Sequence, residues 1–168
     1  MVLIRLLVLV CLVGTGILIE TLAAQNEQTN SKTVTHAAQF HSLSIPGLDN
    51  VFQIDRQFYS GSGPHGEQSF QELKKLGIKT IVSVDGTTPD LVHARKAGMK
   101  YIHIPIGYDG VSEDAGLAFA RVARDLNGPV YIHCHHGKHR GPTAAAVVGL
   151  CRGSLDQNSA LQFLTQAG

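Results

Sequence analysis

The segment of residues 130–143 has the sequence Val-Tyr-Ile-His-Cys-His-His-Gly-Lys-His-Arg-Gly-Pro-Thr. Its first residues are β-branched or aromatic, which predicts a strand over Val130–His133. Its end predicts a helix from Pro142 to about Cys151, with Gly141 as the cap. A strand that turns tightly into a helix directs backbone N–H groups at an anion. We call the turn, residues 134–140, the Cys134 loop; it begins with a thiol and ends with a guanidinium.

The rest of the chain alternates between helical and strand patterns. Apolar residues at helical spacing predict four further helices: Glu67–Leu76, Pro89–Ala97 with Thr88 as its cap, Ser112–Leu126 with Ser112 as its cap, and Leu155–Gln166. β-branched runs predict two further buried strands, Ile78–Val84 and Met99–Ile106. Residues 51–59 predict one or two short edge strands, closed by a turn at residues 60–64. The alternation predicts an α/β fold with a central, mostly parallel sheet flanked by helices.

Composition limits the classes of function. The 168 residues carry a formal net charge of +1 without a charge block, so the sequence indicates neither a nucleic acid nor a charged membrane surface as a partner. The three cysteines, Cys11, Cys134 and Cys151, do not make a disulfide framework, and Cys151 is expected to be a core thiol. Four of the nine histidines lie between His133 and His139, which directs attention to the Cys134 loop.

The N-terminal segment has the pattern of an export signal. Arg5 precedes a nearly uninterrupted apolar run, Leu6–Ile19, and small residues follow it. This predicts a signal peptide over residues 1–24, with an uncleaved membrane anchor as the alternative and a buried helix as a third. Residues 25–45 are polar and predict a linker, so the folded domain is expected over residues 46–168. The expected location is exported, periplasmic or extracytoplasmic, and the anchor would act as a membrane tether.

Three segments are expected to meet at one edge of the sheet. Right-handed crossovers bring the carboxyl ends of parallel strands to the same edge, where ligands bind in open α/β folds. The segments are residues 85–87, residues 107–110 and the Cys134 loop. Asp109 lies 25 residues before Cys134, a separation that suits one helix and one returning strand. We therefore expect the Asp109 carboxyl and the Cys134 thiol to share a site.

The Cys134 loop has the residue types for covalent chemistry on a phosphoryl group. A helix N-terminus and cationic neighbours favour the thiolate, so Cys134 is the expected nucleophile. Arg140 has a planar fork that grips two phosphate oxygens, and the loop amides complete the oxyanion site. Asp109 is the expected general acid, with Asp85 and Asp114 as fallback acids. The other residues expected to line the phosphate site are His135, His136, Gly137, Lys138, His139 and Gly141.

His133-Cys134-x5-Arg140, with Gly137 inside it, resembles the signature loop of the cysteine-based protein tyrosine phosphatase superfamily, particularly a bacterial, exported dual-specificity-like branch. The strand Tyr101–Ile106 followed by Asp109 is similar to that branch's strand and general-acid loop. The resemblance covers residues 45–165 and implies hydrolysis of a phosphomonoester through a phosphocysteine on Cys134, without a cofactor or metal. It also implies that Arg140 binds phosphate, that Asp109 protonates the leaving group and later activates water, and that His133 shapes the loop by hydrogen bonding.

Alternatives stay open at the level of the sequence. Gly141 stands where the superfamily usually has a serine or threonine whose hydroxyl helps the thiolate leave, with Thr143 two positions on. This favours a phosphate-binding module with weak turnover; a rhodanese-like sulfurtransferase is a further alternative. The histidines are metal-ligand types, although neighbours on a tight loop rarely converge on one ion. Lys138 makes the loop similar to that of tensin-type phosphoinositide phosphatases. The expected partner is a phosphorylated protein, a phosphoinositide, an inositol phosphate or a small phosphoester.

Overall fold

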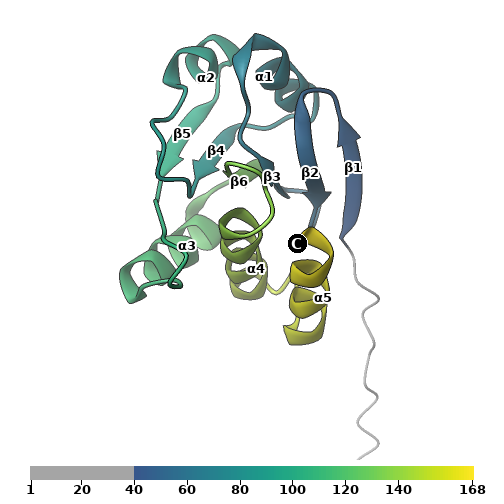
Figure 1. Cartoon of the computed structure of the whole chain (residues 1–168), viewed down its shortest axis with the longest axis vertical. Coiled ribbons are helices and arrows are strands. Elements are labelled where there is room, and N and C mark those ends of the chain that lie inside the picture. Colours follow the sequence, from purple (N-terminus) through teal and green to yellow (C-terminus); the bar gives the residue numbers. More distant parts are fainter. Residues whose placement is uncertain (1–39) are drawn as a thin grey trace, which may run out of the picture. The chain divides into compact units, whose positions relative to one another are not determined.

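The computed structural model describes residues 40–168, in which a six-stranded sheet lies between two layers of helices (Figure 1). In chain order the elements are β1 (His41–Ile45), β2 (Leu48–Gln53), β3 (Phe58–Ser62), α1 (Gly66–Lys75), β4 (Thr80–Ser83), α2 (Leu91–Ala97), β5 (Lys100–His103), α3 (Glu113–Asp125), β6 (Val130–Cys134), α4 (Arg140–Arg152) and α5 (Gln157–Ala167). The predicted signal peptide or anchor lies outside the described residues. None of the helices formed by residues 40–168 is both long and apolar enough to span a bilayer.

The sheet has the strand order β1-β2-β3-β6-β4-β5. Strands β3, β6, β4 and β5 are parallel to one another, whereas β1, β2 and β3 form an antiparallel meander. Helices α1 and α2 cover one face, and α3, α4 and α5 cover the other (Figure 1). The prediction of a central, mostly parallel sheet flanked by helices is therefore confirmed.

The start of the domain differs from the sequence prediction. Strand β1 pairs with β2 and occupies residues 41–45, which the polar composition assigned to the linker. Strand β3 includes residues 60–62, which were expected to form a closing turn, and it is buried throughout rather than at an edge. The reason is tertiary: β3 lies between β2 and β6, and its small residues Ser60, Gly61 and Ser62 allow neighbouring chains to approach closely.

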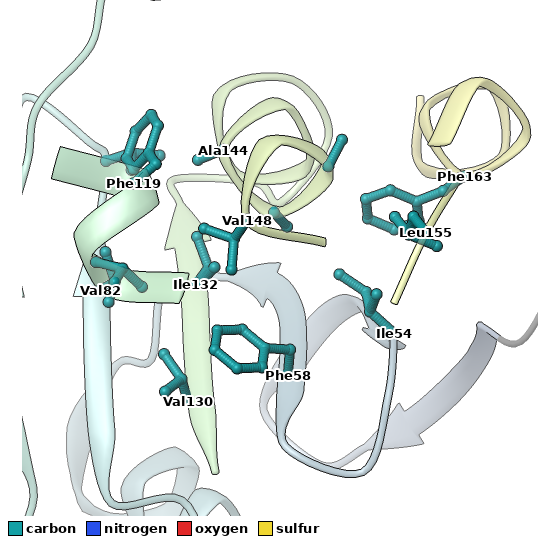
Figure 2. Close-up of a cluster of buried hydrophobic side chains, with 14 of the residues drawn as sticks. Ile54, Phe58, Val82, Phe119, Val130, Ile132, Ala144, Val148, Leu155 and Phe163 are labelled. Atoms are coloured by element: carbon teal, nitrogen blue, oxygen red, sulfur yellow. The ribbon is translucent and has the colours of Figure 1, made fainter. Parts of the chain in front are cut away.

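The side-chain alternation of β6 decides which way the residues of the site face. Val130, Ile132 and Cys134 belong to the apolar cluster under α3, α4 and α5, part of which Figure 2 shows. Tyr131 lies on the opposite face, in the cluster under α1 and α2, and His133 follows it two residues later on that face. The thiol and the imidazole of neighbouring residues are therefore directed to opposite sides of the sheet.

Helix starts differ from the predictions at two positions. Helix α2 begins at Leu91, and its cap is Asp90 rather than Thr88, because the Asp90 carboxylate accepts the His93 N–H (3.2 Å). Helix α4 begins at Arg140, so Pro142 is its third residue, a position where a missing N–H costs no helical hydrogen bond. The predicted cap of α3, Ser112, is confirmed by its bond from Ala115 N–H (3.3 Å). The prediction that Cys151 is a core thiol is wrong, since it lies exposed on the last turn of α4.

Candidate active site

Cys134 ends β6 and lies against the first turn of α4. Cys134 is 4% exposed, and a Cβ placed on Gly141 would lie 3.4 Å from the Cys134 Sγ atom. His139 occupies the N-cap position of α4 without a side-chain cap, so within the described structure no side chain caps the first-turn N–H groups of α4. The positive end of the helix dipole is thus directed at the thiol and the space around it.

Hydrogen bonds to its carbonyls fix the backbone of the Cys134 loop. Three loop carbonyls accept hydrogen bonds from outside the loop: those of His135, Gly137 and His139. The His135 carbonyl accepts from Gly63 N (3.2 Å) and the Gly137 carbonyl from Asn50 Nδ2 (2.7 Å). The His139 carbonyl accepts from Thr143 N (3.0 Å). Every peptide bond among residues 40–168 is trans, which places each carbonyl opposite the following N–H. The N–H groups turned inward by this arrangement are those of His136, Lys138 and Arg140.

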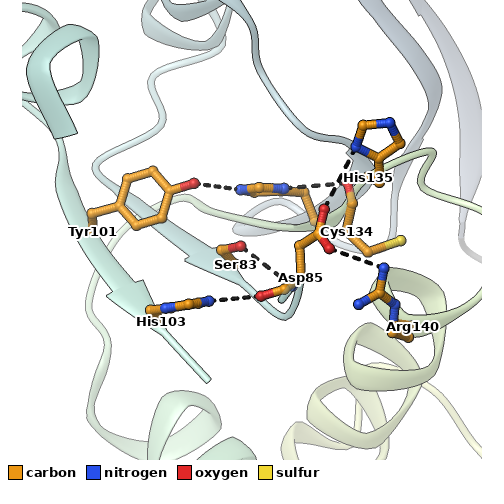
Figure 3. A network of polar contacts seen from close by, with 8 residues as sticks. Ser83, Asp85, Tyr101, His103, Cys134, His135 and Arg140 are labelled. Carbon is orange, nitrogen blue, oxygen red and sulfur yellow. Dashed lines mark hydrogen bonds and ion pairs between the residues drawn. The ribbon is translucent and has the colours of Figure 1, made fainter. Parts of the chain in front are cut away.

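Arg140, at the end of the Cys134 loop, forms an ion pair with Asp85 (Figure 3). One terminal nitrogen donates to Asp85 Oδ1 (2.9 Å), and the two side chains are 13% and 7% exposed. Burial alone would raise the pKa of the Asp85 carboxyl, but Arg140 and hydrogen bonds from Gly86 and Thr87 lower it overall. Asp85 is therefore an ionised partner of Arg140 rather than a proton donor. The buried Nε–H of Arg140 has no partner among the described residues.

His133 supports the loop from the opposite face of the sheet. Its Nδ1 donates to the Cys134 carbonyl (3.3 Å), because a carbonyl only accepts, and its Nε2 then accepts from the Tyr101 hydroxyl (2.7 Å). Burial lowers the pKa of His133 to about 4, against smaller raising effects of the Cys134 hydrogen bond and of Asp85. Burial also raises the pKa of Tyr101 to about 12. Both groups are thus neutral at pH 7, and each donates one proton to a defined acceptor.

The loop that follows β5 reaches the Cys134 loop through Tyr108. The Tyr108 ring is 78% exposed, and its centroid lies 4.7 Å from the Arg140 Cζ and 6.3 Å from the His139 ring centroid. The neighbouring Asp109 is exposed, and its Oδ1 lies against Gly107 of its own loop. The structure thus brings this loop to the site, with the Asp109 carboxyl turned toward its own backbone. The fallback acid Asp114 lies exposed in the first turn of α3.

The remaining predicted residues surround the mouth of the loop. His135, His136, Lys138 and His139 are exposed. The His135 Nδ1 lies 3.7 Å from Asp85 Oδ2, and a cleft of 290 Å³ borders both residues. Within residues 40–168, no three or more potential ligands of the histidine, cysteine, aspartate and glutamate types are grouped to hold a metal ion.

Three residues have roles at the site that were not predicted from the sequence. Asp85 was considered only as an acid, although a carboxylate after a buried strand is a natural partner for an arginine at the same sheet edge. Tyr108 carried a signal, since it directly precedes the predicted acid in its loop. Asn50 carried none, because it contacts a carbonyl 87 residues away.

A parallel sheet that presents a thiol, an oriented set of loop amides and an arginine at one edge defines the class of cysteine-based phosphatases. The family model Tc-R-P, described as "Polymorphic toxin system, DSP-PTPase phosphatase", matches residues 57–154. This is more than half of the chain, and the chain belongs to that family.

Similar proteins agree with this assignment. The dual specificity protein phosphatase TpbA of Pseudomonas aeruginosa (strain UCBPP-PA14) is 27% identical over 121 residues, which are 71% of this chain and 55% of TpbA. The chain thus spans about half the length of this curated relative. A crystal structure of P. aeruginosa TpbA superposes with a TM-score of 0.61 at 26% identity, covering 76% of this chain and 78% of that one. The core catalytic domain of a PP-IP phosphatase from S. cerevisiae shares the fold, with a TM-score of 0.60 at 20% identity over 74% of this chain and 78% of that domain.

Proposed function

We propose that this chain is a cysteine-dependent phosphatase that hydrolyses a phosphomonoester through a phosphocysteine on Cys134. The observation that carries the proposal is the guanidinium of Arg140, which has both a bound and an unbound donor. One terminal nitrogen is held by Asp85, while the buried Nε–H has no partner among residues 40–168. An unpaired buried donor is costly, and a phosphate oxygen would satisfy it. The inward N–H groups of the loop would bind the other oxygens.

The proposed reaction has two displacements. The Cys134 thiolate attacks phosphorus, the S–P bond forms and the ester P–O bond breaks, while Asp109 gives its proton to the departing oxygen. Water then attacks phosphorus, Asp109 takes the water proton, and the S–P bond breaks to release phosphate and the thiolate. Arg140 and the loop amides stabilise the charge on the phosphoryl oxygens in both steps. For this role the exposed Asp109 side chain must first rotate away from Gly107 of its own loop.

A phosphotyrosine-type substrate fits this site. A crystal structure of a TpbA variant with serine in place of a cysteine is described as a complex with pTyr, and it covers 80% of this chain with a TM-score of 0.63 at 23% identity. The two chains therefore share the fold, and the residues around Arg140 in this chain support the same kind of substrate. The exposed Tyr108 ring beside Arg140 offers an aromatic surface for the ring of an aryl phosphate.

A phosphate-binding module with weak turnover is the second candidate, and one observation favours it. Gly141 has no hydroxyl beside Cys134, and the Thr143 hydroxyl donates to the His139 carbonyl (2.9 Å) within its own helix. Neither residue supplies a proton donor to the sulfur during breakdown of the phosphocysteine. Release from Cys134 is therefore the step on which the two candidates differ.

Export of the domain is proposed on the N-terminal sequence, in particular on the apolar run Leu6–Ile19. Fusion of residues 1–45 to a reporter that is active only outside the cytoplasm tests this. Reporter activity together with a shortened mature protein supports a cleaved signal, and activity with the full-length protein in the membrane fraction supports a tether. A reporter that stays inactive contradicts export.

An aryl phosphate assay on the purified full chain tests the proposed reaction. We expect hydrolysis by the wild type, none by Cys134→Ser, and a slower rate with a poor leaving group in Asp109→Asn. Phosphate binding without hydrolysis in the wild type would replace the enzyme with the binding module. Transfer of sulfur from thiosulfate to cyanide would instead support a rhodanese-like activity. An unchanged Asp109→Asn rate would remove Asp109 from the mechanism.

A further inference from the structure

Asn50 has a left-handed backbone conformation, which is uncommon for a residue other than glycine. Among residues 40–168 it is the only residue other than glycine with a positive φ, 52°. It lies in β2, where the pairing with β1 shifts so that Asp49 and Asn50 together oppose Ser44. A β-bulge of this kind redirects one side chain of a strand, and a left-handed residue persists only where the surroundings require it.

The redirected side chain reaches the Cys134 loop. The Asn50 Nδ2 donates to the Gly137 carbonyl (2.7 Å) and to the Ala167 carbonyl at the end of α5 (2.6 Å). An amide nitrogen has two hydrogens, so both are used. The residue after α5 packs on the next residue of the loop, since a Cβ on Gly168 would lie 3.1 Å from the Lys138 Cβ. Asn50 thus joins three segments: β2, the Cys134 loop and the last turn of α5.

The bond to Gly137 decides the direction of one loop amide. In a trans peptide the carbonyl of Gly137 and the N–H of Lys138 point in opposite directions. Asn50 holds the carbonyl outward, so the Lys138 N–H is directed into the loop. Without this bond the Gly137 carbonyl loses the donor that fixes its direction, and glycine at φ 69° has little intrinsic preference that would replace it. A turned peptide would place a carbonyl oxygen, rather than an N–H, against a bound anion.

We propose that Asn50 is a positioning residue for the anion site, which it serves by holding the Gly137–Lys138 peptide with its N–H toward the phosphate. The inference rests on the proposed capture of phosphate by the Cys134 loop. It does not require Asn50 to contact the substrate.

Alkylation of Cys134 tests the proposal without requiring turnover. The full chain is treated with iodoacetate, an anion, and with iodoacetamide, its neutral analogue, and modification of the Cys134 peptide is followed by mass spectrometry. Inorganic phosphate is added as a competitor. The test variant is Asn50→Gly, because glycine adopts the same φ without strain. The control is Gln53→Ala, which removes another side-chain amide bond of β2, that to the Tyr59 hydroxyl (3.0 Å).

The ratio of the two rates is the readout. We expect Asn50→Gly to lower the iodoacetate-to-iodoacetamide ratio and to weaken phosphate protection, each by about tenfold, below the 100-fold or more typical of deleting an oxyanion donor itself. Gln53→Ala should keep the wild-type values. A purely structural defect would change both reagents equally and leave the ratio unchanged, which would overturn the proposal, as would an equal loss in Gln53→Ala.

If Asn50→Gly does not fold, a second variant, Asn50→Asp, tests the same proposal. Asn50→Asp tolerates a left-handed backbone and keeps the size of the side chain, but it faces two carbonyl oxygens with a carboxylate. It should lower the ratio at least as much as Asn50→Gly, and an unchanged ratio overturns the proposal. A wild type that shows neither a preference for iodoacetate nor phosphate protection contradicts the proposed function itself, and the role of Asn50 with it.

Discussion

Replacement of His133 by asparagine should remove a defined part of the pH dependence of stability. His133 is 5% exposed, and burial lowers its pKa from the ordinary 6.5 to about 4. In the folded state its Nδ1–H is held by the Cys134 carbonyl and its Nε2 accepts from Tyr101. A proton added to Nε2 would face the Tyr101 hydroxyl in a buried site. The unfolded chain therefore binds this proton more readily than the folded one.

The sign and size of the effect follow from the two pKa values. Between pH 6.5 and pH 4 the unfolded state binds more protons, so stability rises with pH in this window. The contribution is fully present above pH 6.5 and is lost as the pH falls through 4. The difference of about 2.5 in pKa corresponds to a loss of about 3 kcal/mol in the free energy of unfolding by pH 4.

Urea unfolding of the full chain at a series of pH values between 4 and 8 measures this loss. In His133→Asn the total loss of stability between pH 6.5 and pH 4 should be smaller than in the wild type by about 3 kcal/mol. The variant should also carry a pH-independent cost of about 1–3 kcal/mol for the Tyr101 hydroxyl left without its acceptor. His136→Asn, which removes an exposed imidazole from the same loop, is the matched control and should keep the wild-type slope. A wild type with flat stability across this range, or a His133→Asn variant with the wild-type slope, would refute the argument from burial.

Three further changes test other contacts of the site. Gly137→Ala should lower the free energy of unfolding by about 3 kcal/mol or more, because φ at this residue is 69° and the new Cβ would lie 2.5 Å from a backbone nitrogen of β3. Urea unfolding measures this change, and a loss below about 1 kcal/mol would contradict the close approach. Asp85→Asn should cost about 3 kcal/mol at pH 7 by leaving Arg140 buried without its counter-charge, and inorganic phosphate should raise the unfolding temperature more in this variant than in the wild type. An equal phosphate effect would argue against an anion site at Arg140. Gly141→Ser should speed breakdown of the phosphocysteine about tenfold through a new hydroxyl beside the Cys134 sulfur, seen in stopped-flow assays as a higher steady-state rate after an unchanged burst.

The candidate site was predictable from the sequence where its parts are close along the chain. The thiol, the arginine and the intervening amides belong to one strand–loop–helix unit, and the spacing from Cys134 to Arg140 is a local property. The acid loop was placed at the same sheet edge by topology, and the structure brings Tyr108 of that loop to Arg140. The direction of the Asp109 side chain was not predictable, because an exposed side chain on a glycine-flanked loop has no local feature that selects its rotamer.

The α/β alternation, the mostly parallel sheet and the Cys134 loop could be predicted from local patterns, because hydrophobic periodicity, capping residues and loop spacing act over a few residues. Long-range packing was needed to show that β3 is an internal strand beside β6, that Asp85 holds Arg140 across 55 residues, and that Asn50 holds Gly137 across 87. These contacts join segments whose local sequences do not signal one another. They form because the sheet places such segments side by side and buried polar groups must then find partners.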